Sequence, residues 1–421
     1  RQSNVDDDTA RFTAIAQQIV NNLLSPDVLG LQEVQDNDGA ELSDVTAANE
    51  TLQKLIDAIV AAGGPTYRFI DNTFIGDDAS GGQPGGNIRT AFLYNPDRVS
   101  LVDGSVRTIG SQAPGQAFED TRLPLVATFE FNGKEVTVVN NHFSSKGGSS
   151  PLFGANQPAA DRQEDPTING SLDQRQAQAQ EVKGFVDGLL ANNANANVVV
   201  VGDLNEFEFI SPLLTLEQSL TNLTNTLPEN ERYSFIFDGN SQSLDHILVS
   251  RNLTGQSSFD IVHVNTEFAA TPDRASDHDP LLARFNLAQS VVNGTARRDT
   301  LTGTNDGDII TGGIGADIIT TGGGRDRIVY TSIRDAGDVI TDFTVGLDKL
   351  VFTQLLDSIV PGGYTGTNAI ADGYVSFAAQ GTNTIVRVDQ NGLNNSSPGR
   401  NFLTLQNVSL VEANNPNNFV F

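Results

Sequence analysis

The residues best suited to acid–base chemistry are three of the four histidines in this 421-residue chain. His142 follows two asparagines, His246 follows an aspartate, and His278 lies between two aspartates. Histidine changes its protonation near neutral pH, and neighbouring acids adapt it to proton transfer or metal binding. The fourth histidine, His263, lies between two valines in an alternating run, and we expect it to be structural.

Acid and amide side chains form a further cluster after a run of valines. Asp203 and Asn205 are two residues apart, so on an extended backbone both would point to the same side. Such a pair can hold a water molecule and one oxygen of a phosphate. Asp277 places a hard oxygen ligand next to the base His278, and Asp245 could orient an imidazole as a buried carboxylate does in hydrolases.

Alternating helical and strand patterns must position these side chains. Polar residues at the ends of neighbouring strands favour a site at one edge of a β-sandwich or α/β sheet. Glu33 closes one such strand, although a lone glutamate there is more typical of an exposed or capping residue. The patterns predict helices over 9–24, 49–61 and 172–191, strands over 27–33, 89–94, 125–131, 135–140 and 197–201, and further strands ending at Asp245 and near Phe285.

The composition is strongly acidic and lacks sulfur. There is no cysteine, which excludes disulfides and thiolate metal sites, and no methionine, so we expect a processed or truncated product. The formal net charge is −27, of which residues 1–286 contribute −22. Such a surface repels polyanions, so a nucleic-acid role requires cations at the contact. No apolar run is long enough to span a membrane, and we expect no stable membrane insertion.

A nine-residue repeat runs from residue 294 to 329. Its third copy, 312–320, matches the calcium-binding nonapeptide Gly-Gly-x-Gly-x-Asp-x-apolar-x at every fixed position. Glycines permit the tight turn, carboxylates and carbonyls hold Ca²⁺, and the apolar residue points inward along a parallel β-roll. A Gly/Asp-rich linker with accidental spacing is the alternative. The predicted calcium ligands are Asp299, Asp308, Asp317 and Asp326.

Five motifs in order along residues 5–286 resemble those of the endonuclease/exonuclease/phosphatase superfamily, with most similarity to its bacterial secreted, deoxyribonuclease-I-like nucleases. The motifs are Leu31-Gln32-Glu33, Asn141-His142-Phe143, Gly202-Asp203-Leu204-Asn205, Leu244-Asp245-His246-Ile247-Leu248 and Ser276-Asp277-His278-Asp279-Pro280. The resemblance implies an α/β fold, a four-layered sandwich of two mixed β-sheets flanked by helices. We therefore predict a catalytic domain over 1–286, a β-roll over 287–330 and an all-β region over 331–421.

The resemblance also implies roles for the metal ligands and the proton-transfer groups. Glu33 would be the principal ligand of Mg²⁺ or Mn²⁺, supported by Asp277. His278, held by Asp245, would act as general base or phosphate-polarising group. The family's further metal-site asparagine would be Asn4, or would lie in a segment upstream of the chain.

The remaining implied roles concern the water and the substrate. Asp203 and Asn205 would position the attacking water and the phosphate, and His142 would contact the phosphate. His246 would be a neighbour of the working residue rather than a catalytic group. Candidate partners for the phosphate backbone are Arg89, Lys146 and Arg175.

The C-terminal region resembles the repeat-in-toxin calcium module and the secretion-target segment of type I exported bacterial proteins. This implies export by the type I machinery, folding in extracellular calcium, and a monomeric secreted protein. We expect a nuclease of low sequence specificity that acts on DNA or RNA. The alternatives are a phosphoesterase for another substrate, sphingomyelinase-like or acting on inositol phosphates, and an extracellular structural or adhesive protein with a decayed enzyme domain.

Overall fold

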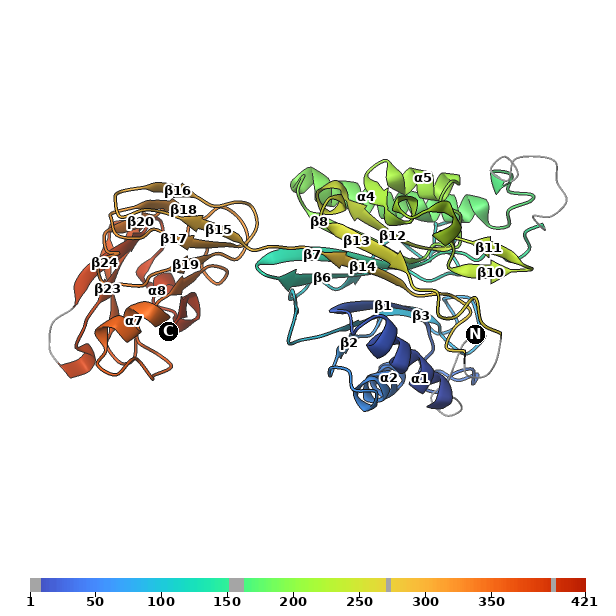
Figure 1. Ribbon diagram of the computed structural model, residues 1–421, viewed down its shortest axis with the longest axis horizontal. Helices are drawn as coiled ribbons and strands as arrows, with labels where there is room; N and C mark the ends of the chain where they lie inside the picture. The colour runs from blue at the N-terminus through green and yellow to red at the C-terminus, as the bar shows by residue number, and fades with distance from the viewer. Residues whose placement is uncertain (1–8, 151–162, 270–273, 395–398) are drawn as a thin grey trace. The chain divides into compact units, whose positions relative to one another are not determined.

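The computed structural model describes residues 9–150, 163–269, 274–394 and 399–421 (Figure 1). The chain divides into two compact units. The first comprises Arg1–Phe131 and Glu135–Asn286, and the second comprises Asn132–Lys134 and Leu287–Phe421. Within the described part of the chain, no helix is long and apolar enough to cross a membrane.

Helices and strands alternate in the first unit. Its helices are α1 (Thr9–Gln17), continued by the π-helical η1 (Gln18–Asn22), α2 (Asn49–Ala61), α4 (Leu172–Asn192), α5 (Ser211–Glu217) and α6 (Arg251–Thr254). Its strands are β1 (Val28–Val34), β2 (Arg68–Ile70), β3 (Arg89–Tyr94), β4 (Ser100–Leu101), β5 (Arg107–Thr108), β6 (Leu125–Phe131), β7 (Lys134–His142), β8 (Asn197–Asp203), β9 (Leu220–Asn222), β10 (Phe235–Phe237), β11 (Asn240–Gln242), β12 (Asp245–Ser250), β13 (Ser257–Ile261) and β14 (Leu281–Phe285).

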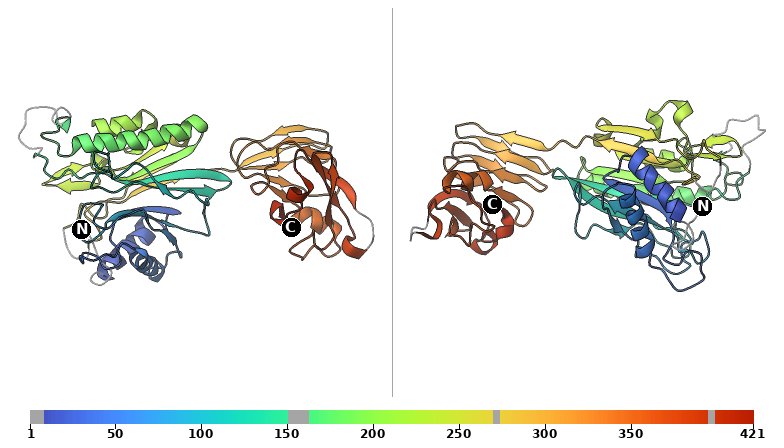
Figure 2. Two further views of the ribbon diagram at one scale, coloured as in Figure 1. Left: turned by 180° about the vertical axis from the view of Figure 1, so that it is seen from behind. Right: turned by 60° about the horizontal axis from the view of Figure 1, so that its bottom comes forward.

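The first unit is a four-layered sandwich, which confirms the predicted fold class. Figures 1 and 2 show α4 and α5 on one outside, then the larger sheet, the smaller sheet, and α1 with α2 on the other outside. Among the described residues the larger sheet has the strand order β4-β6-β7-β8-β12-β9, with β5 beside β6, and the smaller has the order β1-β3-β2. β10 and β11 form a hairpin, and β13 and β14 pair as a separate two-stranded antiparallel sheet.

Apolar side chains on the inner faces of the helices explain these layers. One core joins α4 and α5 to the larger sheet through residues such as Val182, Val200 and Leu213. Another joins α1 and α2 to the smaller sheet through residues such as Phe12 and Ile56. Burial of such aliphatic and aromatic side chains is the main favourable term in folding, at about 1.5–3 kcal/mol each.

The two sheets are held in register by a buried amide. Asn140 of β7 donates through Nδ2 to the carbonyls of Leu31 at 3.0 Å and Ala91 at 2.9 Å, which belong to the smaller sheet. Gly202 lets β7 and β8 approach at the site, because a Cβ built on it would lie 2.0 Å from the carbonyl oxygen of Asn141. With φ +129° this position is also one that side chains rarely adopt.

Strand direction places the polar clusters at one edge of the larger sheet. The prediction that a strand ends at Asp245 is wrong, because Asp245 begins β12. β12 runs antiparallel to β8, so its first residue pairs with the last residue of β8, Asp203. β8 runs parallel to β7, and His142 pairs with Asp203 in the same way. The three polar ends therefore meet.

The second unit is a parallel β-roll that continues into a mixed sheet. One sheet has the order β15-β17-β19-β21-β25 and the other β16-β18-β20-β24-β23-β22. Its strands are β15 (Ser290–Asn293), β16 (Thr300–Thr302), β17 (Asp308–Thr311), β18 (Ile318–Thr320), β19 (Arg327–Val329), β20 (Asp338–Ile340), β21 (Lys349–Val351), β22 (Val375–Gln380), β23 (Asn383–Val388), β24 (Arg400–Leu405) and β25 (Phe419–Val420), and its helices are α7 (Thr353–Ile359) and α8 (Leu410–Ala413).

The repeat positions explain the roll. The apolar residues at the eighth position of copies two to four, Ile310, Ile319 and Ile328, are fully buried between the two sheets. They belong to the same core as Phe352 and Phe402 from the C-terminal region. Because the sheets and the core both run across residue 330, residues 287–330 and 331–421 form one compact unit.

Candidate active site

The centre of the site is an aspartate–histidine pair. Nδ1 of His278 lies 2.6 Å from Oδ2 of Asp245, and no described residue forms a hydrogen bond with Nε2. Burial alone would lower the pKa of His278, but the adjacent carboxylates of Asp245 and Asp203 overcome it and raise the pKa to about 10. His278 is therefore protonated at neutral pH. Of the two roles implied by the resemblance, this charge favours the phosphate-polarising one.

A serine that the sequence interpretation missed holds this pair in place. The Ser234 hydroxyl donates to Oδ2 of Asp245 at 2.6 Å and accepts from the backbone amide of Asp245 at 3.1 Å. Phe235 packs on the other partner, with its ring centre 4.6 Å from that of His278. No motif marks Ser234 or Phe235, since only the β10–β11 hairpin brings them to the site.

Asp203 lies beside this pair and is poised to exchange a proton near neutral pH. Burial and the neighbouring charge of Asp245 raise its pKa to about 7. One ligand atom from each of Asp203, Asp245 and His278 can lie within 4.8 Å of the others, the spacing of a metal-binding group. The two carboxylates of this group are oxygen donors that fit a hard divalent cation such as Mg²⁺ or Mn²⁺, whereas the protonated His278 has no lone pair to offer one.

The predicted metal ligands Glu33 and Asp277 lie at the periphery of this group. Glu33 is exposed, on a bulge of β1 where two residues oppose one of β3, and its φ is +55°. It is therefore inside the strand, not at its end as predicted. Its charge acts on Asp203, and the charge of Asp277 acts on His278. The alternative ligand Asn4 lies outside the described residues.

His142 and Arg122 form the opposite wall of the site. Nε2 of His142 lies 3.7 Å from Oδ2 of Asp203, while its Nδ1 is buried without a hydrogen-bond partner among the described residues. Burial, with the positive charges of Arg122 and His278, holds the pKa of His142 well below its usual range. His142 is therefore a neutral imidazole that can accept or relay a proton.

Arg122 is a further residue that no sequence motif identified. It is only 7% exposed, donates to the carbonyl of Phe143 at 2.9 Å, and has a buried Nε without a partner among the described residues. Burial lowers its pKa, against the nearby carboxylates of Asp203 and Glu33. A guanidinium in this position can bind a phosphate oxygen.

Asn205 reaches the site by a different backbone path from the one predicted. The extended strand stops at Asp203, and Asn205 has a left-handed φ of +51°. Its backbone amide donates to Oδ1 of Asp203 at 2.9 Å, and its side-chain amide donates to the carbonyl of Phe143 at 3.2 Å. The prediction of two side chains on one side of an extended strand is wrong, but Asn205 still borders Asp203.

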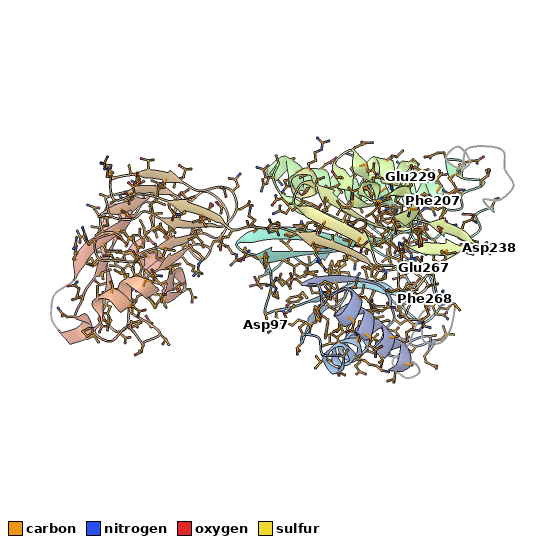
Figure 3. All side chains as sticks on the ribbon, viewed as in Figure 1. Asp97, Phe207, Glu229, Asp238, Glu267 and Phe268 are labelled. Carbon is orange, nitrogen blue, oxygen red and sulfur yellow. The ribbon has the colours of Figure 1, made fainter. Side chains whose placement is uncertain are left out.

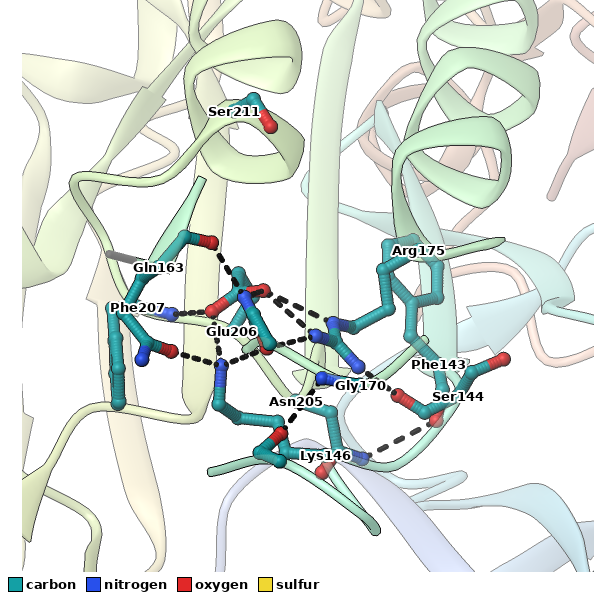
Figure 4. A network of polar contacts seen from close by, with 12 residues as sticks. Phe143, Ser144, Lys146, Gln163, Gly170, Arg175, Asn205, Glu206, Phe207 and Ser211 are labelled. Carbon is teal, nitrogen blue, oxygen red and sulfur yellow. Dashed lines mark hydrogen bonds and ion pairs between the residues drawn. The ribbon is translucent and has the colours of Figure 1, made fainter. Parts of the chain in front are cut away.

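Two of the predicted phosphate partners instead neutralise a buried acid (Figure 4). All five N–H groups of Arg175 donate inside the protein, to Glu206, Asn169 and two backbone carbonyls. Nζ of Lys146 donates to Glu206 at 2.6 Å, to Asn169 at 2.7 Å and to Gln163 at 3.0 Å. The prediction that Lys146 and Arg175 bind the phosphate backbone is wrong, since their donors are already used.

The third predicted phosphate partner, Arg89, is also wrong for that role. Its side chain is 1% exposed, donates to Asp71 at 3.2 Å and to the carbonyl of Asn87 at 3.2 Å, and so stabilises the loops beside β3. A strand-end arginine looks the same in sequence whether it faces solvent or closes an ion pair.

The remaining two histidines are structural contacts. His246 is fully buried, and its Nε2 lies 2.8 Å from the carbonyl oxygen of Glu206. His263 lies 3.0 Å from Asp279 and stacks on Tyr233 with ring centres 4.1 Å apart. Neither imidazole belongs to the Asp203–Asp245–His278 group.

The repeat aspartates form two ladders along the roll. The backbone amides of Asp299 and Asp308 donate to Asp317 and Asp326 of the next coil, each at 2.8 Å. One carboxylate oxygen of each of Asp308, Asp317 and Asp326 is buried without a hydrogen-bond partner among the described residues. Burial raises the pKa of Asp326 to about 8. Asp299 is partly exposed and accepts from Thr295 at 2.7 Å.

Comparison with known proteins assigns the chain to a family. The Endonuclease/Exonuclease/phosphatase family matches residues 2–278, and the chain belongs to this family. Its members are metal-dependent phosphoesterases and nucleases. No curated protein is significantly similar to the chain in sequence.

Several solved structures resemble part of the chain at low sequence identity. Truncated Caenorhabditis elegans TDP2 is 19% identical, with 68% of this chain and 95% of that chain covered and a TM-score of 0.45. An endonuclease/exonuclease/phosphatase from Bacteroides vulgatus is 18% identical, with 68% and 96% covered and a TM-score of 0.44. The Bacteroides thetaiotaomicron mannosyl-6-phosphatase Bt3783 is 17% identical, with 66% and 91% covered and a TM-score of 0.42.

Proposed function

We propose that the first unit is a divalent-metal-dependent phosphodiesterase that hydrolyses nucleic acid with low sequence specificity. The observation that carries this proposal is the protonated His278, held by Asp245 and facing an Asp203 that titrates near neutral pH. An acid and a base of different pKa in one small site can serve the two proton transfers of phosphodiester hydrolysis.

The residues of the site supply each step of in-line displacement. Asp203, with Asn205 beside it, holds the water and takes its proton as the water oxygen bonds to phosphorus. Nε2 of His278 donates to the phosphate group, and Arg122 stabilises the charge that develops on it. The bond to the leaving oxygen then breaks as that oxygen takes the proton of the protonated His278, and Asp203 returns the proton of the water to His278. The neutral His142 contacts the phosphate from the other side of the site.

A divalent cation would neutralise charge on the phosphate and on the departing oxygen. Glu33 and Asp277, at the edge of the acidic group, are the residues we propose to hold it. The close carboxylates of Asp203 and Asp245 support a cation at this site, because Asp245 adds to the burial that raises the pKa of Asp203 and a bound cation would relieve that repulsion.

Cleavage of plasmid DNA with Mg²⁺, with and without a chelator, tests the proposal. The full-length protein should nick DNA only with the metal, and Asp203→Asn should lower the rate at least a hundredfold, about the size of one general acid–base group. Asp97→Asn is the matched control, since Asp97 is exposed and lies at the far end of the first unit from Asp238 (Figure 3). Equal rates in Asp203→Asn and Asp97→Asn would support the decayed-enzyme alternative.

For the second unit we propose a Ca²⁺-stabilised roll that follows type I export to the cell exterior, in a monomeric protein. Cation binding is supported by buried carboxylate oxygens that have no hydrogen-bond partner in the described ranges, on the ladder of Asp308 and Asp326 and on that of Asp317. Asp338 extends the second ladder, because it accepts from the backbone amide of Asp317 at 2.9 Å. Calorimetry with and without Ca²⁺ should show one transition, that of this unit, moving upward with Ca²⁺.

One observation favours a second candidate substrate, a small phosphoester such as a sphingomyelin-like or inositol phosphate. Residues 1–286 carry a net charge of −22, and the side chains of Lys146 and Arg175 are engaged inside the protein. A small substrate needs fewer cations than a polyanion. Hydrolysis of such phosphoesters without any cleavage of nucleic acid would select this candidate.

A further inference from the structure

The β10–β11 hairpin places two aromatic rings in a row that begins at the catalytic histidine. The ring centres of Phe235 and His278 are 4.6 Å apart. The next ring along the strand, Phe237, is nearly parallel to Phe235, with an angle of 12° and centres 6.4 Å apart. Residues two apart in a strand share one face, so the strand itself fixes this alignment.

The outer ring of this row is open to solvent. Phe237 is 56% exposed, while Phe235 is half-buried against the small core of Leu172, Phe207 and Leu244. A large apolar side chain that is exposed one ring away from a catalytic group is available to contact a ligand. The row therefore offers one free aromatic face a short distance from the phosphate position at His278.

The surroundings of the row are acidic. Asp238 lies at the tip of the hairpin, and Glu267, which accepts from the hydroxyl of Tyr233 at 2.7 Å, is exposed at the same end of the unit (Figure 3). Binding that relies on many phosphate contacts is disfavoured there. Stacking of bases on aromatic rings does not need positive charge, and it requires bases whose faces are not already covered by a duplex.

The hairpin tip also argues against insertion into a lipid bilayer. The two residues between the strands are Asp238 and Gly239, which adopt left-handed φ values of +48° and +80°. A membrane-inserting tip would have to carry this carboxylate into the apolar layer ahead of Phe237, which is strongly unfavourable.

We propose that Phe237 and Phe235 bind the unpaired base next to the scissile phosphate, so that the site takes single-stranded nucleic acid in preference to duplex. This inference rests on the proposed nuclease function and names its substrate class. The base stacks on the free face of Phe237, and the phosphate that follows it lies at Nε2 of His278.

Three variants of the full-length protein test whether Phe235 and Phe237 form a base-binding platform. Phe237→Ala removes the free ring, Phe237→Trp restores an aromatic face, and Ile236→Ala is the control because Ile236 lies on the opposite face of the same strand. The substrates are a single-stranded oligonucleotide, the same strand in a duplex, and the same strand with an abasic residue beside the cleavage position. The measured quantity is kcat/KM for each substrate with Mg²⁺.

The wild type and Ile236→Ala should cleave the intact single strand faster than the duplex and about ten- to a hundredfold faster than the abasic strand. In Phe237→Ala both preferences should fall about tenfold, and Phe237→Trp should restore them. Equal cleavage of single strand and duplex by the wild type, or unchanged preferences in Phe237→Ala, would overturn the platform but not the nuclease. If the wild type cleaves no oligonucleotide and hydrolyses phospholipid headgroups in phosphatidylcholine–sphingomyelin vesicles, the proposed function itself fails.

Discussion

Removal of the Asp245 charge should lower the rate of hydrolysis and also change its pH dependence. Asp245→Asn keeps the shape of the side chain but replaces the charged acceptor 2.6 Å from Nδ1 of His278 by an amide. The pKa of His278 now lies near 10 against an ordinary 6.5, a difference worth roughly 4–5 kcal/mol. Asp203 and Asp277 supply part of this, and the charge-assisted hydrogen bond that Nδ1 of His278 donates to Asp245 accounts for about 2–3 kcal/mol.

The loss in kcat/KM should therefore be about 30- to 150-fold at neutral pH. The sign of the pH effect follows from protonated His278 being the active form. In the wild type the rate should hold until the pH approaches 10, whereas in Asp245→Asn the loss of about 2–3 kcal/mol lowers the pKa of His278 by about two units, and the rate should fall above about pH 8.

Rate profiles of oligonucleotide hydrolysis from pH 5 to pH 10, with Asp97→Asn as the matched control, measure this change. Thermal unfolding of each variant separates a catalytic effect from a loss of folded protein. A basic limb that stays at the same pH in Asp245→Asn would refute the role assigned to the pair, whatever the size of the loss.

Three further substitutions probe the rest of the molecule. Arg122→Gln should lower kcat about 10²- to 10³-fold, as expected for the loss of one donor to the developing charge, and NMR titration should show the pKa of His142 rising. Glu206→Gln should destabilise the first unit by about 3–5 kcal/mol in denaturant unfolding, because it leaves buried cations uncompensated; a change below 1 kcal/mol would contradict the network in Figure 4. With a chelator, stability of the second unit should fall as the pH rises from about 4 to about 8, since the folded state holds the proton of Asp326 longer than the unfolded state does. Asp326→Asn should remove part of this pH dependence of stability in calorimetry. A stability that rises with pH over the same range would show that the pKa of Asp326 is not raised in the folded unit.

Periodicity and local propensity predicted most of the architecture. The helix over 49–61 and the strand over 89–94 have the predicted bounds, because each is a local pattern with a clear stop signal. The direction of β12 was not predictable in this way. The apolar residues of β12 do not show at which end of the strand Asp245 lies. Only the pairing with β8 shows that Asp245 begins the strand.

The site shows where such reasoning stops. Ordered motifs identified Asp203, Asp245 and His278, which the fold brings together. Ser234 and Arg122 were missed because each lies in a loop and acts through tertiary contacts. Basic residues were assigned to a substrate, since the sequence does not show that Glu206 is fully buried and binds two of them.

The most direct test of the account is hydrolysis of single-stranded and plasmid DNA and of RNA by the full-length protein with Mg²⁺. The account predicts cleavage that a chelator abolishes, that His278→Gln lowers at least a hundredfold and that Asp97→Asn leaves unchanged. Failure to cleave any of these nucleic acids, in a folded protein that does hydrolyse a small phosphoester, would contradict it.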